Sequence, residues 1–230
     1  MKGGTTALRT NLAKHPNICI PEKEVHFYDL EPDSNDATRA KYYSSIAHCK
    51  RANVTVAGTG SPRYCSILEV PYLIHQDNPN TKIIMCIRNP VDRAFSAFTM
   101  HHASPNATEF ENIIRGDMQS PSIALRKFGV VHRPRSVFIQ GGFYSAEIQR
   151  YASVFGRSRI HLVCNENTKG PDGSVSYDEL FDYLKVPRIN IDLGEYFKGK
   201  YNGATVPPAL RKDLNEIFQP WNDDLIHWLE

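Results

Sequence analysis

The sequence has no apolar run close to the roughly 18 residues that a membrane span needs. It opens with Met1-Lys2-Gly3 and not with the apolar stretch of a signal peptide. Its net charge is only +2 over 230 residues, so the molecule as a whole is no general binder of polyanions. No known nucleic-acid-reading motif is present, and we expect no nucleic-acid partner.

Cysteine is also scarce, and the five residues form no obvious pattern. Their odd number does not suggest a disulfide framework, and no pair has the spacing of zinc ligands, so no metal is expected. Cys86 and Cys164 lie in apolar, strand-like runs, which favours buried free thiols. The ATPase-type loop G-x-x-x-x-G-K-[ST] is absent, which disfavours a nucleotide kinase.

What the sequence does contain is an alternation of helical and strand-like segments, without repeats or a linker. The apolar spacing predicts helices at residues 5–14, 91–102, 144–155, 178–184 and 208–218. Short apolar runs predict strands at residues 54–57, 82–87 and 160–164. This order is typical of a single α/β domain over residues 1–230, with a central parallel sheet flanked by helices. Ligands of such sheets bind beyond the carboxyl ends of the strands.

The chain starts with a candidate phosphate-binding loop, which consists of Lys2, Gly3, Gly4, Thr5 and Thr6. Glycines let backbone N–H groups approach an anion, and the start of the following helix adds partial positive charge. Lys2 supplies a full positive charge. The alternative interpretation is an ordinary Gly-Thr helix cap.

Several motifs, in this order, resemble the heparan sulfate sulfotransferases. They are KGGTTAL at residues 2–8, EKEVHFYD at 22–29, SPRY at 61–64 and IRNPVDRAFS at 87–96. The likeness is greatest to the glucosaminyl 3-O-sulfotransferase branch, with the N-sulfotransferase domain a near relative. The resemblance implies a P-loop-like sulfotransferase fold. It also implies an enzyme that moves a sulfuryl group from 3′-phosphoadenosine 5′-phosphosulfate (PAPS), without a metal, to a carbohydrate hydroxyl or amine.

The resemblance also implies which residues bind the donor. The 5′-phosphosulfate is assigned to Lys2, Gly3, Gly4, Thr5 and Thr6. The 3′-phosphate is assigned to Arg88 and Ser96, because a guanidinium fork and a hydroxyl suit a phosphate monoester. A late loop closing over the nucleotide is assigned to Lys198, Gly199 and Lys200. The alternatives are a salt bridge from Arg88 to Asp92 or another surface acid, and a solvated basic turn at residues 198–200.

On the acceptor side, Glu24 resembles the family's general base. His26 would share its face if the segment is extended, and Lys2 would neutralise charge on the leaving phosphate. His26 could equally be a core residue, because it stands between Val25 and Phe27.

The sequence departs from the family at several places. Gly60 stands where the 3-O branch has a second lysine, and Arg63 is the nearest replacement for its charge. The strand that precedes the phosphate loop is missing, so we expect a domain truncated at its N-terminus, with a membrane anchor only if one lies upstream. No cysteine follows Cys164, where the glucosaminyl enzymes have a disulfide-bonded hairpin.

We expect an anionic polysaccharide, such as a heparan sulfate-like glycosaminoglycan, as the partner. Basic clusters that could attract it are found at residues 126–127, 132–135 and 157–159. The resemblance and two sequons, at Asn53 and Asn106, favour the Golgi lumen or another part of the secretory pathway. Two alternatives stay open: a sulfotransferase acting on a small alcohol, phenol or lipid through a histidine base, and a non-catalytic relative that only binds nucleotide or glycan.

Overall fold

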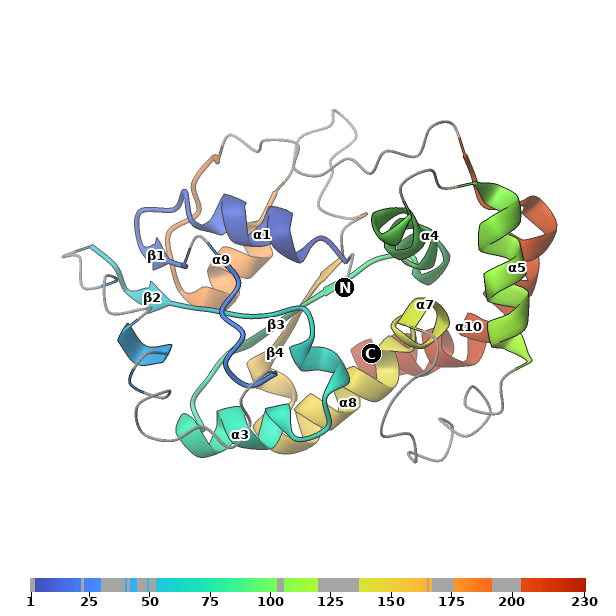
Figure 1. The fold of residues 1–230 in the computed structure, drawn as a ribbon. Helices are drawn as coiled ribbons and strands as arrows, with labels where there is room; N and C mark the ends of the chain where they lie inside the picture. The colour runs from blue at the N-terminus through green and yellow to red at the C-terminus, as the bar shows by residue number, and fades with distance from the viewer. Residues whose placement is uncertain are drawn as a thin grey trace. The chain divides into compact units, whose positions relative to one another are not determined.

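The computed structural model describes residues 3–21, 23–29, 40, 42–44, 49, 53–102, 106–119, 137–164, 166, 176–191 and 204–230 (Figure 1). The chain forms two compact units. Residues 4–86 and 150–197 make up what we call the strand unit, and residues 1–3, 87–149 and 198–230 make up the helical unit. Helix α8, Tyr144–Phe155, has residues in both units. The single domain expected over residues 1–230 stays a prediction.

The strands form two pairs. Strand β1, Ile18–Cys19, runs parallel to β2, Val56–Ala57, with Ile18 opposite Val56. Strand β3, Ile83–Ile87, lies beside β4, Ile160–Cys164. The predicted α/β class is confirmed, but the described strands form two two-stranded sheets in place of one central sheet. Strands β1 and β2 have only two residues each, so few backbone groups are available there for pairing with a further strand.

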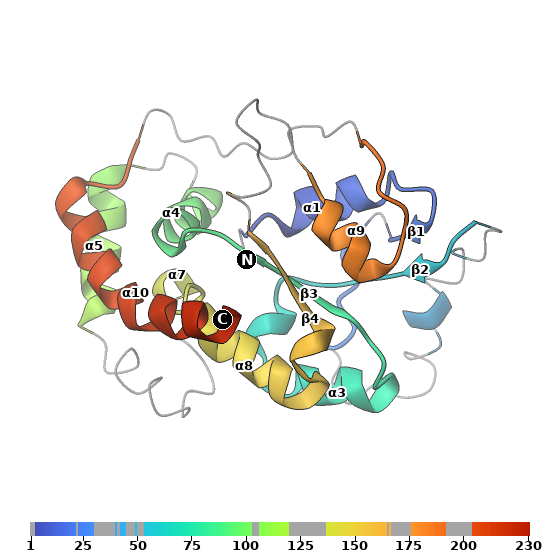
Figure 2. The ribbon, with the colours of Figure 1, turned by 180° about the vertical axis from the view of Figure 1, so that it is seen from behind.

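Helices cover two sides of the strand unit (Figures 1 and 2). Helix α1, Thr5–Leu12, and α9, Asp178–Leu184, bury apolar side chains against the strands on one side. Helix α3, Val70–Asp77, lies on the other side and packs near the short turn η1, Tyr64–Ser66. Burial of these apolar side chains is the main stabilising contribution.

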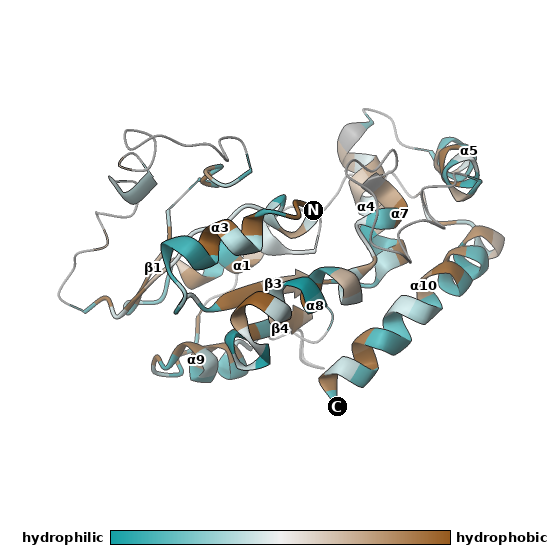
Figure 3. Cartoon of the chain, turned by 90° about the horizontal axis from the view of Figure 1, so that it is seen from below, coloured by the Kyte–Doolittle hydropathy of each residue, from teal (hydrophilic) through white to brown (hydrophobic). Residues whose placement is uncertain are grey.

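The helical unit is built from α4, Pro90–His101, α5, Ala107–Met118, α7, Val137–Gln140, and α10, Pro208–Leu229. Its core is rich in phenylalanine, and Phe98, Phe110 and Phe218 have no exposed surface. Gly142 is required by this packing, because a Cβ there would lie 2.7 Å from the Phe218 ring. In Figure 3, β3 is largely hydrophobic, whereas α10 alternates between hydrophobic and hydrophilic residues.

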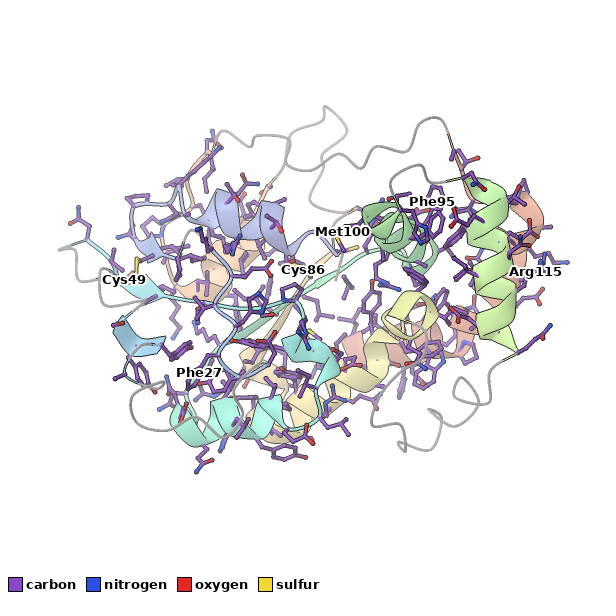
Figure 4. All side chains as sticks on the ribbon, in the orientation of Figure 1. Phe27, Cys49, Cys86, Phe95, Met100 and Arg115 are labelled. Carbon is purple, nitrogen blue, oxygen red and sulfur yellow. A yellow bond between two sulfur atoms is a disulfide. The ribbon has the colours of Figure 1, made fainter. Side chains whose placement is uncertain are left out.

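The structure corrects two predictions. Helix α10 does not end at Phe218 but continues through Pro220 to Leu229, because buried Leu225 extends its apolar face and a proline removes only one backbone donor. Cys19 and Cys49 form a disulfide, seen in Figure 4, although the odd cysteine count suggested none. Sequence spacing missed it because the two residues are 30 positions apart. Cys86 and Cys164 form no disulfide, as predicted, but both are half-buried where buried side chains were expected.

Helices α3 and α5 and strand β1 were not predicted. Helix α5 begins with a clear N-cap, since the Asn106 side chain accepts a hydrogen bond from the Glu109 amide at 2.7 Å. Among the described helices, none combines the length and the apolar character that crossing a membrane requires.

Candidate functional site

The candidate phosphate loop leads into α1. Gly4 is the N-cap residue and has φ 102°, a left-handed conformation that favours glycine. Because Gly4 has no side chain, the first amides of α1 receive no side-chain cap. An ordinary Gly-Thr helix cap would place the same glycine here, so the phosphate-binding role of the loop stays a prediction. Buried Leu8 and Leu12 anchor the helix that carries this loop. Lys2 lies outside the described residues.

The turn after β3 carries Arg88 and is built differently. Asn89 caps α4, and its side-chain oxygen accepts hydrogen bonds from the amides of Val91 at 3.1 Å and Asp92 at 3.2 Å. The Arg88 amide donates to the Tyr144 hydroxyl at 3.4 Å. The backbone on both sides of Arg88 is therefore fixed, and its half-buried side chain extends from a defined position.

The alternative partner of Arg88 is engaged elsewhere. Asp92 pairs with the Arg211 guanidinium at 2.6 Å, and across the described ranges no acid forms an ion pair with Arg88. Arg93 lies near Arg88 and is buried, with a hydrogen bond to the Phe138 carbonyl oxygen. Burial lowers the pKa of Arg93, and the charge of Arg88 lowers it further. Two guanidinium groups, those of Arg88 and Arg93, therefore lie near the start of α4. Arg88 has no acidic partner among the described residues.

Two further donor-side predictions have different outcomes. Ser96 lies in the second turn of α4, as predicted, but it is only 2% exposed. Its hydroxyl is therefore not presented to solvent in this structure. Lys198, Gly199 and Lys200 lie outside the described residues.

The acceptor side has a group of four side chains, Glu24, His26, Asp29 and Ser61, which we call the acceptor cluster. Hydrogen bonds join the last three, and Glu24 lies beside His26. The centre of the cluster is the Asp29 carboxylate, whose side chain is completely buried. His26 Nδ1 lies 2.9 Å from Asp29 Oδ2, and Ser61 Oγ donates to the same oxygen at 2.8 Å. A carboxylate only accepts, so Nδ1 bears a proton in this arrangement and Nε2 points away from Asp29.

Glu24 completes the cluster. Its Oε2 lies 3.6 Å from His26 Nε2, with the Glu24 side chain 29% exposed and that of His26 36% exposed. The two residues share a face, as expected for an extended segment. Since His26 is partly exposed and bonded to a carboxylate, the core interpretation does not hold. Their catalytic roles stay predictions.

Tyr64 holds the segment that carries Glu24 and His26. The segment can be located in Figure 4 by the label of Phe27, which follows His26. The Tyr64 hydroxyl donates to the Val25 carbonyl at 2.6 Å and accepts from the Phe27 amide at 3.3 Å. The Tyr151 hydroxyl in turn donates to the Tyr64 carbonyl at 3.0 Å. Burial raises the pKa of Tyr64, so its hydroxyl keeps the proton it donates. We call the Tyr64 hydroxyl, with its hydrogen bonds to the Val25 carbonyl and the Phe27 amide, the tyrosine clamp.

Asp29, Ser61 and Tyr64 lie within the motifs of residues 22–29 and 61–64, and the sequence alone predicts no role for them. Asp29 could have been found, because it follows His26 by three residues in a polar-aromatic stretch. The position of Ser61 beside Asp29 depends on a contact across 32 residues, which no local pattern predicts. No cluster of acidic, histidine and cysteine residues suited to a metal occurs within the described ranges, and the metal-free mechanism stays a prediction.

Comparison with known proteins decides the family. The model of the sulfotransferase domain family matches residues 1–188. The chain belongs to the sulfotransferase family. The predicted resemblance is thereby confirmed, and the family uses PAPS as its co-substrate. The members of this family are sulfotransferases, so the predicted enzyme class is confirmed.

Two curated relatives of this sulfotransferase chain are human heparan sulfate glucosamine 3-O-sulfotransferases. Heparan sulfate glucosamine 3-O-sulfotransferase 6 is 28% identical, and the match covers 96% of this chain and 67% of that protein. Heparan sulfate glucosamine 3-O-sulfotransferase 3B1 is 27% identical, and the match covers 96% of this chain and 59% of that protein. This chain therefore spans about two thirds of the length of the first relative and less of the second. A solved sulfotransferase from Alicyclobacillus acidocaldarius is 25% identical, with a TM-score of 0.69, and the match covers 97% of this chain and 90% of that one.

Proposed function

We propose that the protein transfers a sulfuryl group from PAPS to a hydroxyl or amine of a carbohydrate, in particular a heparan sulfate-like glycosaminoglycan. The observation that carries this proposal is the acceptor cluster, in which Glu24 lies beside a histidine oriented by a buried aspartate. The family match supports the donor, and the names of the curated relatives support the acceptor class.

In the proposed reaction, Glu24 takes the proton of the acceptor hydroxyl. The acceptor oxygen forms a bond to sulfur, and the bond between sulfur and the bridging phosphate oxygen breaks. 3′-Phosphoadenosine 5′-phosphate (PAP) leaves with the negative charge, which Lys2 would neutralise. His26, held by a hydrogen bond to Asp29, lies 3.6 Å from Glu24 and would orient Glu24 and the acceptor.

The donor is proposed to bind through two groups of residues. Gly3, Gly4, Thr5 and Thr6, with the uncapped amides of α1, would bind the 5′-phosphosulfate. Arg88 would bind the 3′-phosphate, supported by its fixed backbone and the lack of an acidic partner within the described ranges. Ser96 and the loop of residues 198–200 are further proposed contacts.

The proposal is tested in two steps. Calorimetry with PAP measures donor binding, and radiolabelled PAPS is then incubated with a panel of glycosaminoglycans, neutral oligosaccharides and small alcohols. We expect PAP binding and label transfer to a glycosaminoglycan. PAP binding without transfer to any acceptor would favour a non-catalytic relative, and the absence of both would reject the proposal.

A second candidate is sulfuryl transfer to a small alcohol, phenol or lipid with His26 as the base. The pairing of His26 Nδ1 with buried Asp29 favours it, because such a pair leaves Nε2 available for a proton. Glu24→Gln and His26→Gln distinguish the candidates. Loss of activity only with His26→Gln, on a small-molecule acceptor, would support the second.

We also propose that the protein matures in the secretory pathway, with the Golgi lumen as its place of action. The Cys19–Cys49 disulfide suits an oxidising compartment, and Asn53 and Asn106 of the two sequons are exposed. Non-reducing mass spectrometry of protein from its native source would test the disulfide and both glycans.

A further inference from the structure

Arg63 stands at the edge of the acceptor cluster on a fixed piece of backbone. Its amide donates to the Ser61 hydroxyl at 3.2 Å, and its carbonyl accepts from the Ser66 amide at 3.0 Å and the Ser66 hydroxyl at 3.0 Å. The base of the side chain is therefore positioned by the turn, while the side chain itself is 49% exposed.

The guanidinium of Arg63 is only loosely neutralised. Its Nε lies 3.8 Å from Asp29 Oδ2, which is too far for a hydrogen bond, and that oxygen already accepts from Ser61 and His26. Elsewhere in the described chain, no side-chain hydrogen bond of Arg63 is present. A guanidinium carries five N–H donors in a planar fork, so most of its binding capacity is available to a ligand beside the candidate base.

The charge of the acceptor cluster makes this cation significant. Its four residues carry two carboxylates, Glu24 and Asp29, and no permanently charged cation. An acidic acceptor approaching Glu24 would be repelled by these charges. Arg63 offsets the Glu24 charge on the exposed side, because Asp29 is buried whereas the guanidinium is not.

We infer that Arg63 binds an anionic group of the acceptor, a sulfate or carboxylate next to the reacting hydroxyl or amine, and so selects acidic over neutral glycans. This inference rests on the proposed function and names a residue that would select its acceptor. The fork geometry suits the paired oxygens of both anions, and a charge-assisted hydrogen bond is stronger than a neutral one.

The test compares Arg63→Gln and Arg63→Lys with the native chain on two acceptors of equal length, a sulfated heparan-type oligosaccharide and a neutral N-acetylglucosamine oligosaccharide. We expect Arg63→Gln to lower kcat/KM for the sulfated acceptor about tenfold, mainly through KM. The neutral acceptor should change less than about twofold, and added salt should reduce the difference between variant and native chain. Arg63→Lys should keep part of the preference. Lys212→Gln, an exposed residue on α10, controls for net charge.

Equal losses on both acceptors would overturn the inference, because Arg63 would then only neutralise Asp29. Affinity of the sulfated oligosaccharide, measured by calorimetry without donor, gives a readout that does not require turnover. If the native chain binds PAP but sulfates neither acceptor, the proposed function fails. Arg63 is then judged by this affinity alone, and an unchanged value for Arg63→Gln overturns the inference too. PAP affinity and the thermal unfolding midpoint report whether each variant is folded.

Discussion

The phosphate loop and the acceptor cluster both contain residues of the strand unit but are built in opposite ways. At the start of α1, Gly4 provides backbone conformation and no side chain, so the first amides have no side-chain cap. In the acceptor cluster, two side chains converge on one buried carboxylate oxygen, and the tyrosine clamp fixes the backbone around His26. The loop is suited to bind an anion that arrives, whereas the cluster is oriented before any ligand binds. Variants of the cluster should therefore change turnover, and variants of the donor side should change donor affinity.

The largest effect is expected from Glu24→Gln, which removes the proposed base while keeping its shape. Turnover with a glycosaminoglycan acceptor should fall roughly 10²- to 10⁴-fold, the usual contribution of general base catalysis. PAP affinity should stay unchanged, because Glu24 is not assigned to the donor. Label transfer and calorimetry measure the two quantities, and a variant with native turnover would show that Glu24 is not the base.

On the donor side, Arg88→Gln should weaken PAP binding about 10- to 100-fold, since a hydrogen bond to a charged group contributes about 1.5–3 kcal/mol. Adenosine 5′-phosphosulfate, which lacks the 3′-phosphate, should bind the variant and the native chain alike. Arg115→Gln is the matched control, because Arg115 pairs with Glu111 and Asp213 and has no assigned donor contact. A similar loss with both nucleotides would mean that Arg88 does not contact the 3′-phosphate.

Gly4→Ala tests the left-handed backbone of the loop directly. A non-glycine residue at φ 102° costs about 1–2 kcal/mol, which should appear as a lower free energy of unfolding or as about tenfold weaker PAP binding. Gly116→Ala, inside α5 with nothing within 4 Å of the added Cβ, should raise the free energy of unfolding by up to about 1 kcal/mol. Urea unfolding of both variants measures the contrast, and equal behaviour would indicate that Gly4 needs no special conformation.

Tyr64→Phe removes the tyrosine clamp and keeps the ring. Each lost hydrogen bond costs about 1 kcal/mol in stability, but the bonds act on the acceptor segment and not on the reacting atoms. We therefore expect only part of this free energy to affect turnover, so that kcat falls roughly fivefold while KM for PAPS stays constant. Tyr72→Phe, on the exposed face of α3, should leave both constants unchanged. A change in donor KM with constant kcat would show that Tyr64 does not act through the acceptor segment.

The smallest effect is a gain. A Cβ added at Gly60 would have no heavy atom within 4 Å apart from its chain neighbours, so the first atom of a lysine side chain fits at this position. From Gly60→Lys, which introduces the lysine that the 3-O branch carries, we expect an increase of a few-fold in kcat/KM with a glycosaminoglycan, at the scale of a partly exposed charge. Gly60→Ala separates the charge from the change in backbone freedom. No gain with lysine would mean that the position does not face the reacting groups.

Much of this protein could be read from local sequence. The helices at residues 144–155 and 178–184 and the strand at 160–164 were predicted with their bounds, because apolar periodicity and buried β-branched runs are local signals. Helix α10 was predicted too short, because Pro220 is a local stop signal that burial of Leu225 overrides. The motifs of residues 2–29, 61–64 and 87–96 sufficed to indicate the family, since the spacing of glycines, basic residues and hydroxyls is itself sequence information.

Only the tertiary structure decided which of those residues meet. Asp29 became the centre of the acceptor cluster because folding brings Ser61 to it, and Cys19 found Cys49 across a 30-residue separation. The burial of Ser96 and the pairing of Asp92 with Arg211 were likewise settled by packing within the helical unit. Local propensity determines helices and strands because their hydrogen bonds join near neighbours, whereas the partners of a side chain depend on how distant segments pack.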